Sequence, residues 1–337
     1  MAPFSSLDQS HIWSVSHAEA PERVTSAWID EQLADTYERC GIRAGLLESV
    51  AGITARRWWS EETSFDEAAA LAGARALEQA GVTPDEVDLL ISTSVSKHHL
   101  EPSVACAVHH RLGLPATCTN YDLGNACLGF VNAMTIASMA IATGQARVVL
   151  IVDGEGSRQV QTETIARLRR EDATVTDVFE QFASLTIGSG AAAMVMGAPR
   201  SDSHAFLGGV TRAATKHHEL CIGDLQGMRT DTAALLESGL DLAQQTFSDA
   251  LDDGWRWRDC DRYVLHQVSK VHTSRLCELL DIDQARVPLS YPEFGNIGPA
   301  ALPYTLSSIA DDLATGDRVL LMGIGSGLNC SMAELVW

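Results

Sequence analysis

The chain has 337 residues, of which 46% are hydrophobic and 20% are charged, and its formal net charge at pH 7 is −20. This length suffices for two domains or one duplicated unit with a sizeable core, and the composition is typical of a globular α/β protein. The acidic balance excludes nucleic acid and anionic membranes as partners, because both require a basic surface.

The chain has eight cysteines, and no two of them stand in Cys-x-x-Cys spacing. Zinc-ribbon and thioredoxin-like sites are therefore not expected, and neighbouring histidine pairs such as His98–His99 lack the His-Glu-x-x-His spacing of a zinc site. No cationic segment followed by an apolar run stands at the start, and no apolar stretch is long enough to span a bilayer. We expect a cytoplasmic protein with reduced thiols, no integral membrane segment and no bound metal.

Hydrophobic periodicity predicts strands and helices in alternation up to residue 154. Ser64 and Glu67 form a capping-box pattern at the start of an Ala-rich helix. The segment GITARRWW (52–59) is predicted to be a turn with a basic-aromatic tip. The predicted strands are 11–16, 87–96 and 146–154, and the predicted helices are 24–40, 64–80, 103–112 and 131–144.

Residues 155–183 are strongly charged and helical in pattern, with no obvious place in a core. We expect them to pass over the surface as part of a lid or a dimer contact. The next segment, SLTIGSGAAAMVMG (184–197), is predicted to be a hairpin through Gly188 and Gly190.

The second half of the chain repeats the first in outline. CDRYVLHQVS (260–269) parallels VDLLISTSVS (87–96), and DRVLLMGIGSG (317–327) parallels ARVVLIVDGEG (146–156). Two copies of a β/α unit are the simplest account of this pattern, with chance similarity between short apolar strands as the alternative.

The polar segment APRSDSH (198–204) is the predicted boundary between the two copies. We therefore predict an N-terminal half, residues 1–197, and a C-terminal half, residues 205–337. The helical excursion belongs to the first of them.

The stretch NYDLGNACLGF (120–130) joins a strand-like segment to a buried helix and has Cys127 at its centre. Free backbone N–H groups and the positive end of a helix dipole stabilise a thiolate, so Cys127 is predicted to be a reactive nucleophile. Gly124 and Gly129 leave room for a ligand beside it. A small buried structural cysteine is the alternative for any Cys taken alone.

Two further residues follow apolar strands in the same way, His266 in YVLHQVS and Asn296 in the turn FGNIGPA. Ligands gather at such strand ends in α/β sheets. A Cys beside a His forms a thiolate–imidazolium pair or uses the His as a base, and an imidazole N–H with an amide NH₂ stabilises an oxyanion or enolate. Taken singly, a structural histidine and a turn asparagine are the alternatives.

The last segment of the chain, GIGSGLNCSMAELVW (323–337), is rich in glycine. It does not fit a dinucleotide fingerprint, since the third glycine lies one position early and too few residues follow for a βαβ unit. Ser326 and Ser189 both lack the glycine two residues earlier that a serine nucleophile elbow needs. We expect a tight turn at Ser326 that brings a backbone N–H towards a thioester on Cys127.

Together these motifs resemble the condensing enzymes of the thiolase superfamily, of the ketoacyl synthase III type. The resemblance rests on Cys127, on His266 in HQ, on Asn296 in GNxGPA and on the terminal GxGSG, and it covers essentially the whole chain. It implies a five-layered αβαβα fold, an obligate homodimer, and no cofactor other than coenzyme A as the carrier of the acyl substrates. It also implies that the Cys is acylated, that the His and Asn form one oxyanion hole, and that backbone N–H groups of Cys127 and about Ser326 form the other.

The chain departs from fatty-acid-initiating synthases at three positions. Ser269 stands where their HQAN motif has its Asn, Val50 where they have a basic residue used with CoA, and Glu101 where they usually have a threonine. The Glu101 loop, with GITARRWW, NACLGF and FGNIGPA, most resembles the OleA family, which carries out the first step of long-chain olefin biosynthesis. In that family the matching glutamate reaches across the dimer into its partner's site and acts as the base.

The resemblance implies a non-decarboxylative Claisen condensation of two fatty acyl-CoA molecules to a 2-alkyl-3-ketoacyl-CoA, with downstream enzymes of the same pathway as candidate partners. Three alternatives stay open: a decarboxylating 3-oxoacyl-carrier-protein synthase III, one subunit of a β-lactone-forming pair, and an inactive thiolase-fold scaffold. Without the resemblance, Glu101 is a solvated loop carboxylate or the N-terminal charge of a helix.

Groups for the CoA moiety are few in so acidic a chain. Trp58 and Trp59 are candidates for contact with the adenine ring. The phosphates of CoA have five candidate contacts: Arg56, Arg57, Arg212, Lys216 and Arg229.

Overall fold

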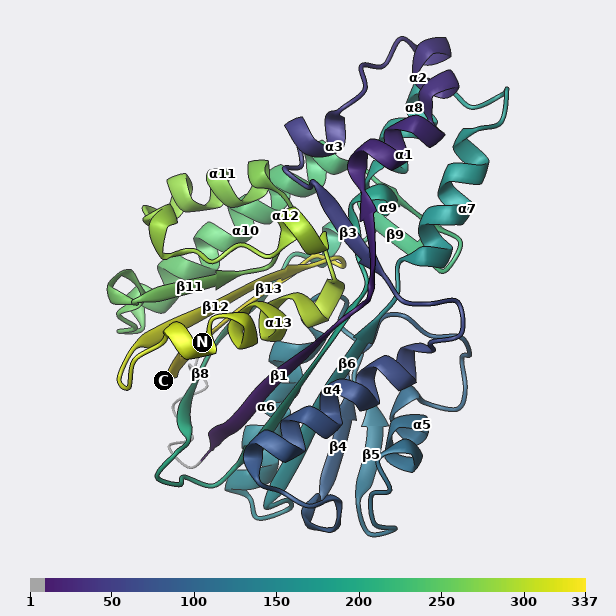
Figure 1. Ribbon diagram of the computed structural model, residues 1–337. Coiled ribbons are helices and arrows are strands. Elements are labelled where there is room, and N and C mark those ends of the chain that lie inside the picture. The colour runs from purple at the N-terminus through teal and green to yellow at the C-terminus, as the bar shows by residue number, and fades with distance from the viewer. Residues whose placement is uncertain (1–9) are drawn as a thin grey trace.

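The structure is a computed structural model that describes residues 10–337 (Figure 1). Residues 1–9, with which the predicted first half begins, lie outside the described part. Nine strands form the main sheet: β1 (His11–Glu19), β4 (Leu89–Ser92), β5 (Thr119–Asp122), β6 (Val148–Glu155), β7 (Gly190–Gly197), β8 (His204–Ala213), β11 (Arg262–Leu265), β12 (Arg318–Gly325) and β13 (Asn329–Val336).

The order of these strands shows two similar halves, β5-β4-β6-β7-β1 and β11-β12-β13-β8. In the first half β4 is parallel to β6, and β7 runs antiparallel to β6 and β1. In the second half β11 is parallel to β12, and β13 runs antiparallel to β12 and β8. Within the sheet, the two halves are joined where the starts of β1 and β8 pair. This is the pattern that duplication would produce, and the boundary at 198–204 stays a prediction.

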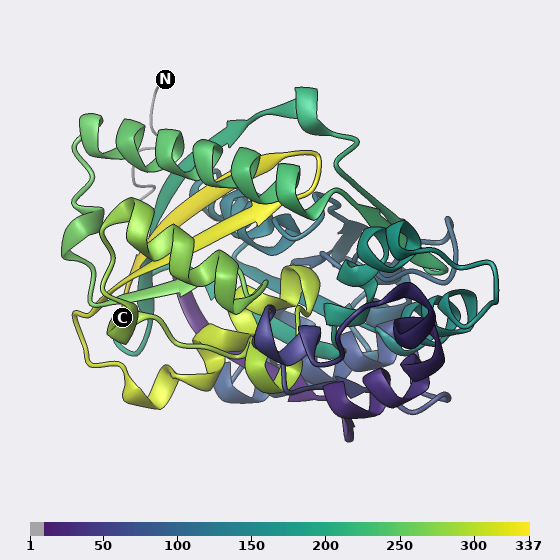
Figure 2. The same ribbon diagram turned by 90° about the horizontal axis from the view of Figure 1, so that it is seen from above.

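Three layers of helices enclose the two halves of the sheet. Helices α4 (Phe65–Ala80) and α5 (Val104–Arg111) cover the outer face of the first half. Helices α10 (Thr232–Asp252) and α11 (Lys270–Leu280) cover the outer face of the second half, and Figure 2 shows α10 lying along β12 and β13. Helices α6 (Gly129–Ala142) and α13 (Ala301–Ser308) lie between the halves. The layers therefore follow the expected αβαβα order.

Strand β6 shows why the sequence folds into buried layers. Its even-numbered residues Val148, Leu150 and Val152 pack with α4, whereas Val149 and Ile151 pack with the helices of the middle layer. Side chains of a strand alternate between faces, so a strand covered on both sides needs an unbroken apolar run. The strand predicted at 146–154 and the helices predicted at 64–80, 103–112 and 131–144 are confirmed with small shifts of their ends, whereas the strand predicted at 87–96 is present but shorter, at Leu89–Ser92.

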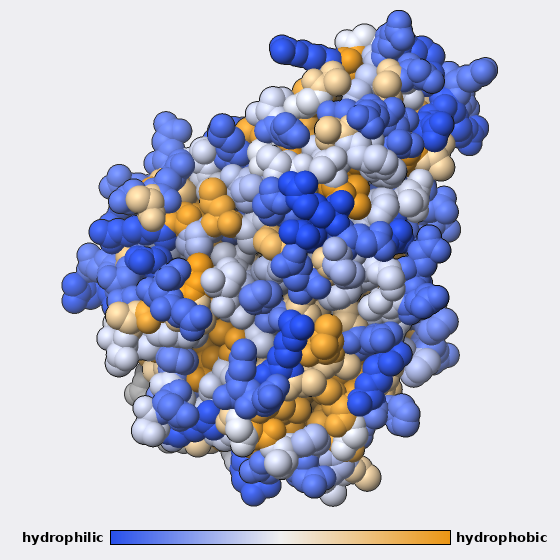
Figure 3. All heavy atoms as spheres, in the orientation of Figure 1, coloured by the Kyte–Doolittle hydropathy of each residue, from blue (hydrophilic) through white to orange (hydrophobic). Residues whose placement is uncertain are grey.

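A separate lobe of short elements stands beyond one end of the sheet, at the top of Figure 1. Figure 3 shows that the exposed surface of this lobe is mostly hydrophilic. Its helices are α1 (Ser26–Gln32), α2 (Ala34–Cys40), α3 (Leu46–Ser49), α7 (Arg158–Leu168), α8 (Val175–Glu180) and α9 (Phe182–Thr186), and beside them lie the strand pairs β2 (Glu22–Thr25) with β3 (Ala55–Trp58) and β9 (Cys221–Asp224) with β10 (Gly227–Thr230).

The remaining elements are short connections. They are α12 (Tyr291–Phe294) and the 3-10 turns η1 (Pro84–Glu86), η2 (Thr215–His217), η3 (Trp257–Asp259), η4 (Gln284–Arg286), η5 (Gly298–Ala300) and η6 (Ala310–Asp312). No helix within residues 10–337 has both the length and the apolar character needed to cross a membrane.

Two predictions for the lobe were wrong. The single helix predicted at 24–40 is strand β2 followed by two helices that meet at Leu33, and the turn predicted at 52–59 contains strand β3. The run of two arginines suggested exposure, yet Arg56 is fully buried. Its guanidinium donates to the Leu185 carbonyl at 2.9 Å and to Ser26 Oγ at 3.1 Å, so burial does not leave it without partners.

The excursion at 155–183 does have a core, contrary to the prediction. Ile165, Leu168 and Val178 pack with Ile29 and Leu47 of the first lobe helices, together with Leu33, Tyr37 and Leu185. Isolated apolar residues within charged helices gave too weak a pattern to predict this cluster, because their partners lie more than a hundred residues away along the chain.

The hairpin predicted at 184–197 is a single strand, β7, preceded by helix α9. Gly188 is needed for close approach and not for a turn, since a Cβ there would lie 1.8 Å from the Phe294 carbonyl oxygen.

Gly154 marks the tightest contact between β6 and α4. A Cβ at this position would lie 2.2 Å from the Phe65 carbonyl oxygen and 2.9 Å from the Ala69 nitrogen, both of them backbone atoms. We therefore expect Gly154→Ala to destabilise the protein by about 3 kcal/mol, measured by thermal or urea unfolding. Gly124→Ala is the control, because Gly124 is exposed and no atom lies within 4 Å of its Cβ position. Equal unfolding midpoints for the two variants would contradict this reading of the contact.

Candidate active site

Cys127 lies in the turn between β5 and α6, two residues before the helix begins at Gly129. Ala126, just before it, has a φ of 45°, a left-handed conformation that is costly for a residue with a Cβ. A Cβ at Gly129 would lie 3.1 Å from the Thr93 carbonyl oxygen and 3.2 Å from that of Leu123. The turn is therefore held in a strained form by close packing against β4 and β5, which fixes the position of the thiol.

The surrounding protein raises the pKa of Cys127 to about 12, mainly because it removes the thiol from water. The carboxyl groups of Glu155 and Asp153 and the thiol of Cys221 act in the same direction. Burial thus outweighs the stabilisation of a thiolate that was predicted for the helix terminus, although the Cys127 backbone N–H does lower the pKa. Cys127 rests as a neutral thiol.

His266 and Asn296 are in direct contact. The ring Nε2 of His266 lies 3.1 Å from Asn296 Oδ1, which also accepts a hydrogen bond of 3.0 Å from the Gly298 backbone N–H. An amide oxygen is an acceptor, so the proton of the His266 ring is on Nε2. His266 is only 4% exposed, and this burial lowers its pKa to about 4, against the opposing effects of Asn296 and the Ile324 backbone. The imidazole is therefore neutral at pH 7.

Backbone contacts hold Asn296 from the side of strand β7. Its N–H donates to the Thr186 carbonyl at 2.9 Å, and its carbonyl accepts from the Gly188 N–H at 2.9 Å. Gly295 has a φ of 66°, which allows the chain to turn sharply just before it. The amide group is thus presented by a rigid turn and not by a free loop.

Gln267, the second residue of the HQ motif, is fully buried and joins the two segments that carry His266 and Asn296. Its Oε1 accepts from the Ser290 N–H at 2.8 Å, and its Nε2 donates to the Leu265 carbonyl at 2.8 Å. These bonds link the end of β11 to the segment that leads into the Asn296 turn.

The end of β12 lies between Cys127 and His266. The His266 N–H donates to the Met322 carbonyl at 2.8 Å, and a Cβ on Gly325 would lie only 3.5 Å from the Cys127 backbone nitrogen. Ser326 directly follows, in the tight turn between β12 and β13. The structure thus brings Cys127, His266 and Asn296 around one strand end, with the Ser326 turn next to Cys127.

Glu101 lies elsewhere, on the exposed loop 97–103 between β4 and α5. Among the described residues, no hydrogen bond or ion pair joins it to Cys127, His266 or Asn296. Its neighbour Leu100 is fully exposed. Glu101 is therefore exposed and not bonded to the site of its own chain.

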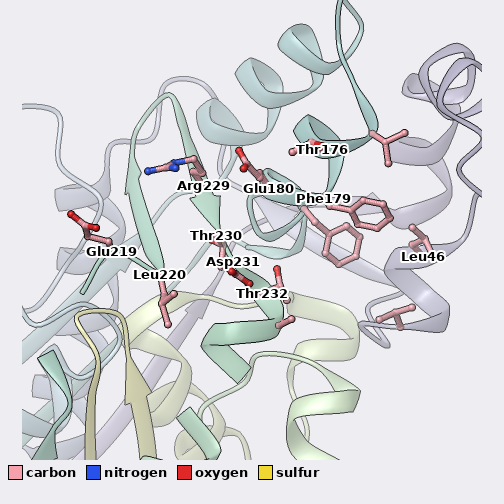
Figure 4. A pocket seen from close by; sticks show the side chains of 14 residues that line it. Leu46, Thr176, Phe179, Glu180, Glu219, Leu220, Arg229, Thr230, Asp231 and Thr232 are labelled. Atoms are coloured by element: carbon pink, nitrogen blue, oxygen red, sulfur yellow. The ribbon is translucent and has the colours of Figure 1, made fainter. Parts of the chain in front are cut away.

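A pocket of about 670 Å³ lies in the lobe, between α8, α3 and the hairpin of β9 and β10. Figure 4 shows Phe179 and Leu46 on one side and Thr230 on the other. The Thr230 hydroxyl donates to the Cys221 sulfur at 3.4 Å, and the Cys221 thiol is near enough to raise the pKa of Cys127. Residues of α8, in the 155–183 segment, form one wall of the pocket.

Most of the cations considered for CoA have structural roles. Arg56 is buried, Arg57 pairs with Glu19 at 3.0 Å, and Arg212 pairs with Asp249. Of the two tryptophans, Trp58 donates to Gln161 and Trp59 to the Glu155 carbonyl. Lys216 lines a second cavity, of about 400 Å³. Arg229 is the candidate that lines the larger pocket.

Sequence analysis missed two buried acids, Asp153 and Glu155, at the end of β6. The signal was present in VDGEG, where two carboxylates two residues apart follow an apolar run and must share one face of the strand. No group of metal-ligating side chains suited to a metal ion occurs within residues 10–337.

Comparison with known proteins identifies the family to which this chain belongs. The model of the thiolase N-terminal domain matches residues 30–206, and that of the 3-oxoacyl-[acyl-carrier-protein] synthase III C-terminal domain matches residues 251–337. An acyl-CoA:acyl-CoA alkyltransferase of Xanthomonas campestris pv. campestris is 44% identical over 331 residues, which are 97% of this chain and 98% of the relative. The chain belongs to the OleA family of thiolase-fold acyltransferases.

A second relative and two solved structures support this assignment to the OleA family. An acyl-CoA:acyl-CoA alkyltransferase of Shewanella oneidensis is 31% identical over 341 residues, covering 96% of this chain and 97% of the relative. The crystal structure of a Xanthomonas campestris OleA variant with bound lauric acid and lauroyl-CoA superposes with a TM-score of 0.96 at 42% identity, covering 98% of this chain and all of that chain. The cerulenin-bound enzyme from the same organism gives 0.95 at 43% identity, with complete coverage of both chains.

The neutral state of Cys127 in this OleA-family protein can be measured with iodoacetamide. With a pKa of about 12, the thiolate fraction and thus the alkylation rate should rise about tenfold per pH unit between pH 7 and 10. Mass spectrometry of the Cys127 peptide gives the rate, and a Cys127→Ser variant gives the background from other thiols. A thiolate–imidazolium pair would instead give a rate that is already constant above about pH 6.

Proposed function

We propose that this protein joins two fatty acyl-CoA molecules by a non-decarboxylative Claisen condensation, giving a 2-alkyl-3-ketoacyl-CoA in the first step of long-chain olefin biosynthesis. The observation that carries the proposal is the contact of His266 with Asn296 at the strand end beside Cys127. Membership of the OleA family supports the same reaction. The solved relatives include Xanthomonas OleA variants with a cysteine, a histidine or a glutamate replaced, the residue types proposed to act here.

The first step is acylation of Cys127. Because thiol and imidazole are both neutral, the thiol proton leaves as the sulfur attacks the thioester, and His266 accepts it at Nδ1, the ring nitrogen that carries no proton. The tetrahedral oxyanion accepts hydrogen bonds from the backbone N–H groups of Cys127 and of the Ser326 turn. Coenzyme A leaves as the thiol, and the acyl group stays on Cys127.

The second step forms the new carbon–carbon bond. Glu101 of a second subunit removes an α-proton from the second acyl-CoA, and the enolate oxygen accepts hydrogen bonds from His266 Nε2–H and the Asn296 amide. The enolate carbon attacks the thioester carbonyl on Cys127 and releases the thiolate. No carboxylate is lost, so a base is needed that decarboxylating enzymes do without.

This role for Glu101 requires a homodimer. Strand β5 is one edge of the sheet and can pair with a second copy, and Val95 and Leu100, which follow its neighbour β4 in the chain, are exposed apolar residues. Burial of this face in a symmetric dimer would carry each Glu101 loop towards the other subunit.

The cellular setting is part of the proposal. All eight cysteines lie within the described residues and are free, which suits the reducing cytoplasm. We propose acyl-CoA as the only small-molecule partner, coenzyme A as its carrier, and enzymes that consume the β-keto product as the downstream partners.

Substitution of Glu101 separates the two steps. With a long-chain acyl-CoA as sole substrate, wild type should form the condensed product, whereas Glu101→Ala should acylate Cys127 normally and lose condensation by about 10³-fold or more. Intact-mass spectrometry follows the acyl-enzyme, and the β-keto acid or its ketone is the product. Glu62→Ala, at another exposed loop carboxylate, is the control and should behave as wild type.

The rival activities give different outcomes in the same assay. Product that forms only when a malonyl thioester is added would identify a decarboxylating synthase. Ser269 speaks against this, because its hydroxyl caps α11 by accepting the His272 N–H at 3.2 Å and offers no amide to a malonyl group. Acylation without condensation in wild type would indicate a second, different subunit, as in β-lactone-forming pairs.

Arg229 is proposed to contact the CoA phosphates at the pocket. Arg229→Ala should raise KM for acyl-CoA about five- to tenfold with kcat nearly unchanged, since the contact is made equally before and during reaction. The matched control is the N-acetylcysteamine thioester of the same fatty acid, which lacks phosphates and should react equally with both proteins. An equal loss with both thioesters would assign Arg229 to the structure of the pocket instead.

A further inference from the structure

Two buried carboxyl groups, Asp153 and Glu155, stand beside the centre described above and take no part in the proposed steps. They end β6 and lie two residues apart on one face of it, the face towards the middle layer of helices. Asp153 has no exposed surface and Glu155 only 6%. Among residues 10–337, no arginine, lysine or histidine forms an ion pair with either.

Glu155 is surrounded by hydrogen-bond donors. Its Oε1 accepts from the Val95 N–H at 2.6 Å, and its Oε2 accepts from the Ser96 N–H at 3.2 Å and from Ser96 Oγ at 2.6 Å. Three donors compensate a negative charge that is removed from water. Burial raises the pKa of Glu155 to about 7, and these donors oppose that rise and favour its ionised form.

Asp153 has far fewer partners. Its Oδ2 accepts from the Thr93 hydroxyl, and its Oδ1 is buried without a hydrogen-bond partner. A buried carboxylate with one donor beside a second carboxylate is strongly unfavourable, whereas a carboxylic acid donating to that neighbour is satisfied. Asp153 and Glu155 are alternate residues of β6, so their carboxyl groups are neighbours on one face of the strand.

We propose that Asp153 holds the single proton of this acid pair and that ionised Glu155 is a positioning residue, which fixes both the Glu101 loop and the Asn296 turn. The catalytic consequence rests on the proposed role of Glu101. The pair would thus connect the base that serves one subunit's site with the oxyanion hole of the other.

The contact with the Glu101 loop lies at its start. Val95 and Ser96, the residues that donate to Glu155, come directly before the loop 97–103. Asp122 is the second anchor, because it accepts from Lys97 Nζ at 2.8 Å at the start of the loop and from the Ala105 N–H at 2.9 Å just past its end. Loss of the Glu155 contacts would free one of two anchors.

The contact with the Asn296 turn lies on the other side of Glu155. A Cβ on Gly298 would lie 3.5 Å from the Glu155 carboxyl carbon, so the side chain packs directly against this turn. Gly298 is the residue whose N–H holds Asn296 Oδ1. Glu155, in the first half of the chain, therefore supports a turn in the second.

The burial that raises the pKa of both acids agrees with a shared proton, and the donors Val95 and Ser96 oppose this rise for Glu155. The negative charge of Glu155 also raises the pKa of Cys127. Glu155 thus hinders thiolate formation, and removal of its charge should not slow acylation.

Two isosteric substitutions test the assignment of the proton. Glu155→Gln removes the charge, places an amide donor against the Val95 or Ser96 N–H, and should cut condensation by about 100-fold, as expected when a catalytic group is displaced by about 1 Å. Acylation of Cys127 should stay at or above the wild-type rate. Asp153→Asn keeps a donor towards Glu155 and an acceptor for Thr93, so both steps should stay within about threefold of wild type.

Amide hydrogen exchange gives a readout that does not depend on Glu101 chemistry. Exchange at Val95 and Ser96 should speed up at least tenfold in Glu155→Gln and remain at the wild-type rate in Asp153→Asn. If Glu101→Ala still condenses, the proposed base is wrong, yet this difference in exchange would still establish the anchoring by Glu155.

Three results would overturn the inference. These are equal effects of the two substitutions, equal loss of acylation and condensation in Glu155→Gln, and unchanged exchange at Val95 and Ser96. Ser96→Ala replaces Glu155→Gln if the latter does not fold, because it removes one donor and leaves both acids. It should reduce condensation by a smaller factor, again with normal acylation, and an unchanged product rate would also contradict the proposal.

Discussion

The burial of one layer of helices between two sheets is the constraint on which the rest of this structure depends. Helix α6 begins two residues after Cys127, and the chain enters α13 just after Asn296. Both helices lie in the middle layer, packed in a single apolar cluster with strands of both halves. Because duplicated halves bury equivalent helices against each other, the turns that start those helices must meet. The nucleophile and the oxyanion hole are thus brought together by the same packing that forms the core.

Burial also determines the electrostatic character of the site. Transfer of a thiol and an imidazole out of water disfavours their charged forms, and it raises the pKa of Cys127 to about 12 and lowers that of His266 to about 4. An ion pair would need compensation that the free site does not supply. Proton transfer from Cys127 therefore has to accompany attack on the thioester, when the developing oxyanion is met by backbone N–H groups.

Much of this could be predicted from the sequence because the signals are local. Apolar runs such as that of β6 predict doubly buried strands, and residues like Cys127 and His266 directly follow such runs. The failures have a common physical origin in contacts made far along the chain. Arg56 was expected at an exposed turn, but it is buried and donates to the Leu185 carbonyl. Gly188 was expected in a hairpin turn, but it allows the close approach of the Phe294 carbonyl. The spacing of Asp153 and Glu155 is visible in the sequence, but the hydrogen-bond donors that surround Glu155 come from residues about 60 positions earlier and are not.

The proposed positioning role explains why a buried negative charge is retained next to Cys127, where it raises the pKa of the thiol. A buried negative charge next to Cys127 opposes deprotonation of the thiol, so its presence needs a reason that acylation does not provide. Condensation provides one, because it needs a loop that carries Glu101 out of one subunit and a turn that holds Asn296 in the other half of the chain. The ionised Glu155 side chain accepts from the consecutive N–H groups of Val95 and Ser96, just before that loop, and packs against that turn. Hydrogen bonds to a charged group are stronger than those to a neutral one, so both segments are held more firmly. Retention of only one negative charge by the pair keeps this rigidity while limiting the penalty on the thiol.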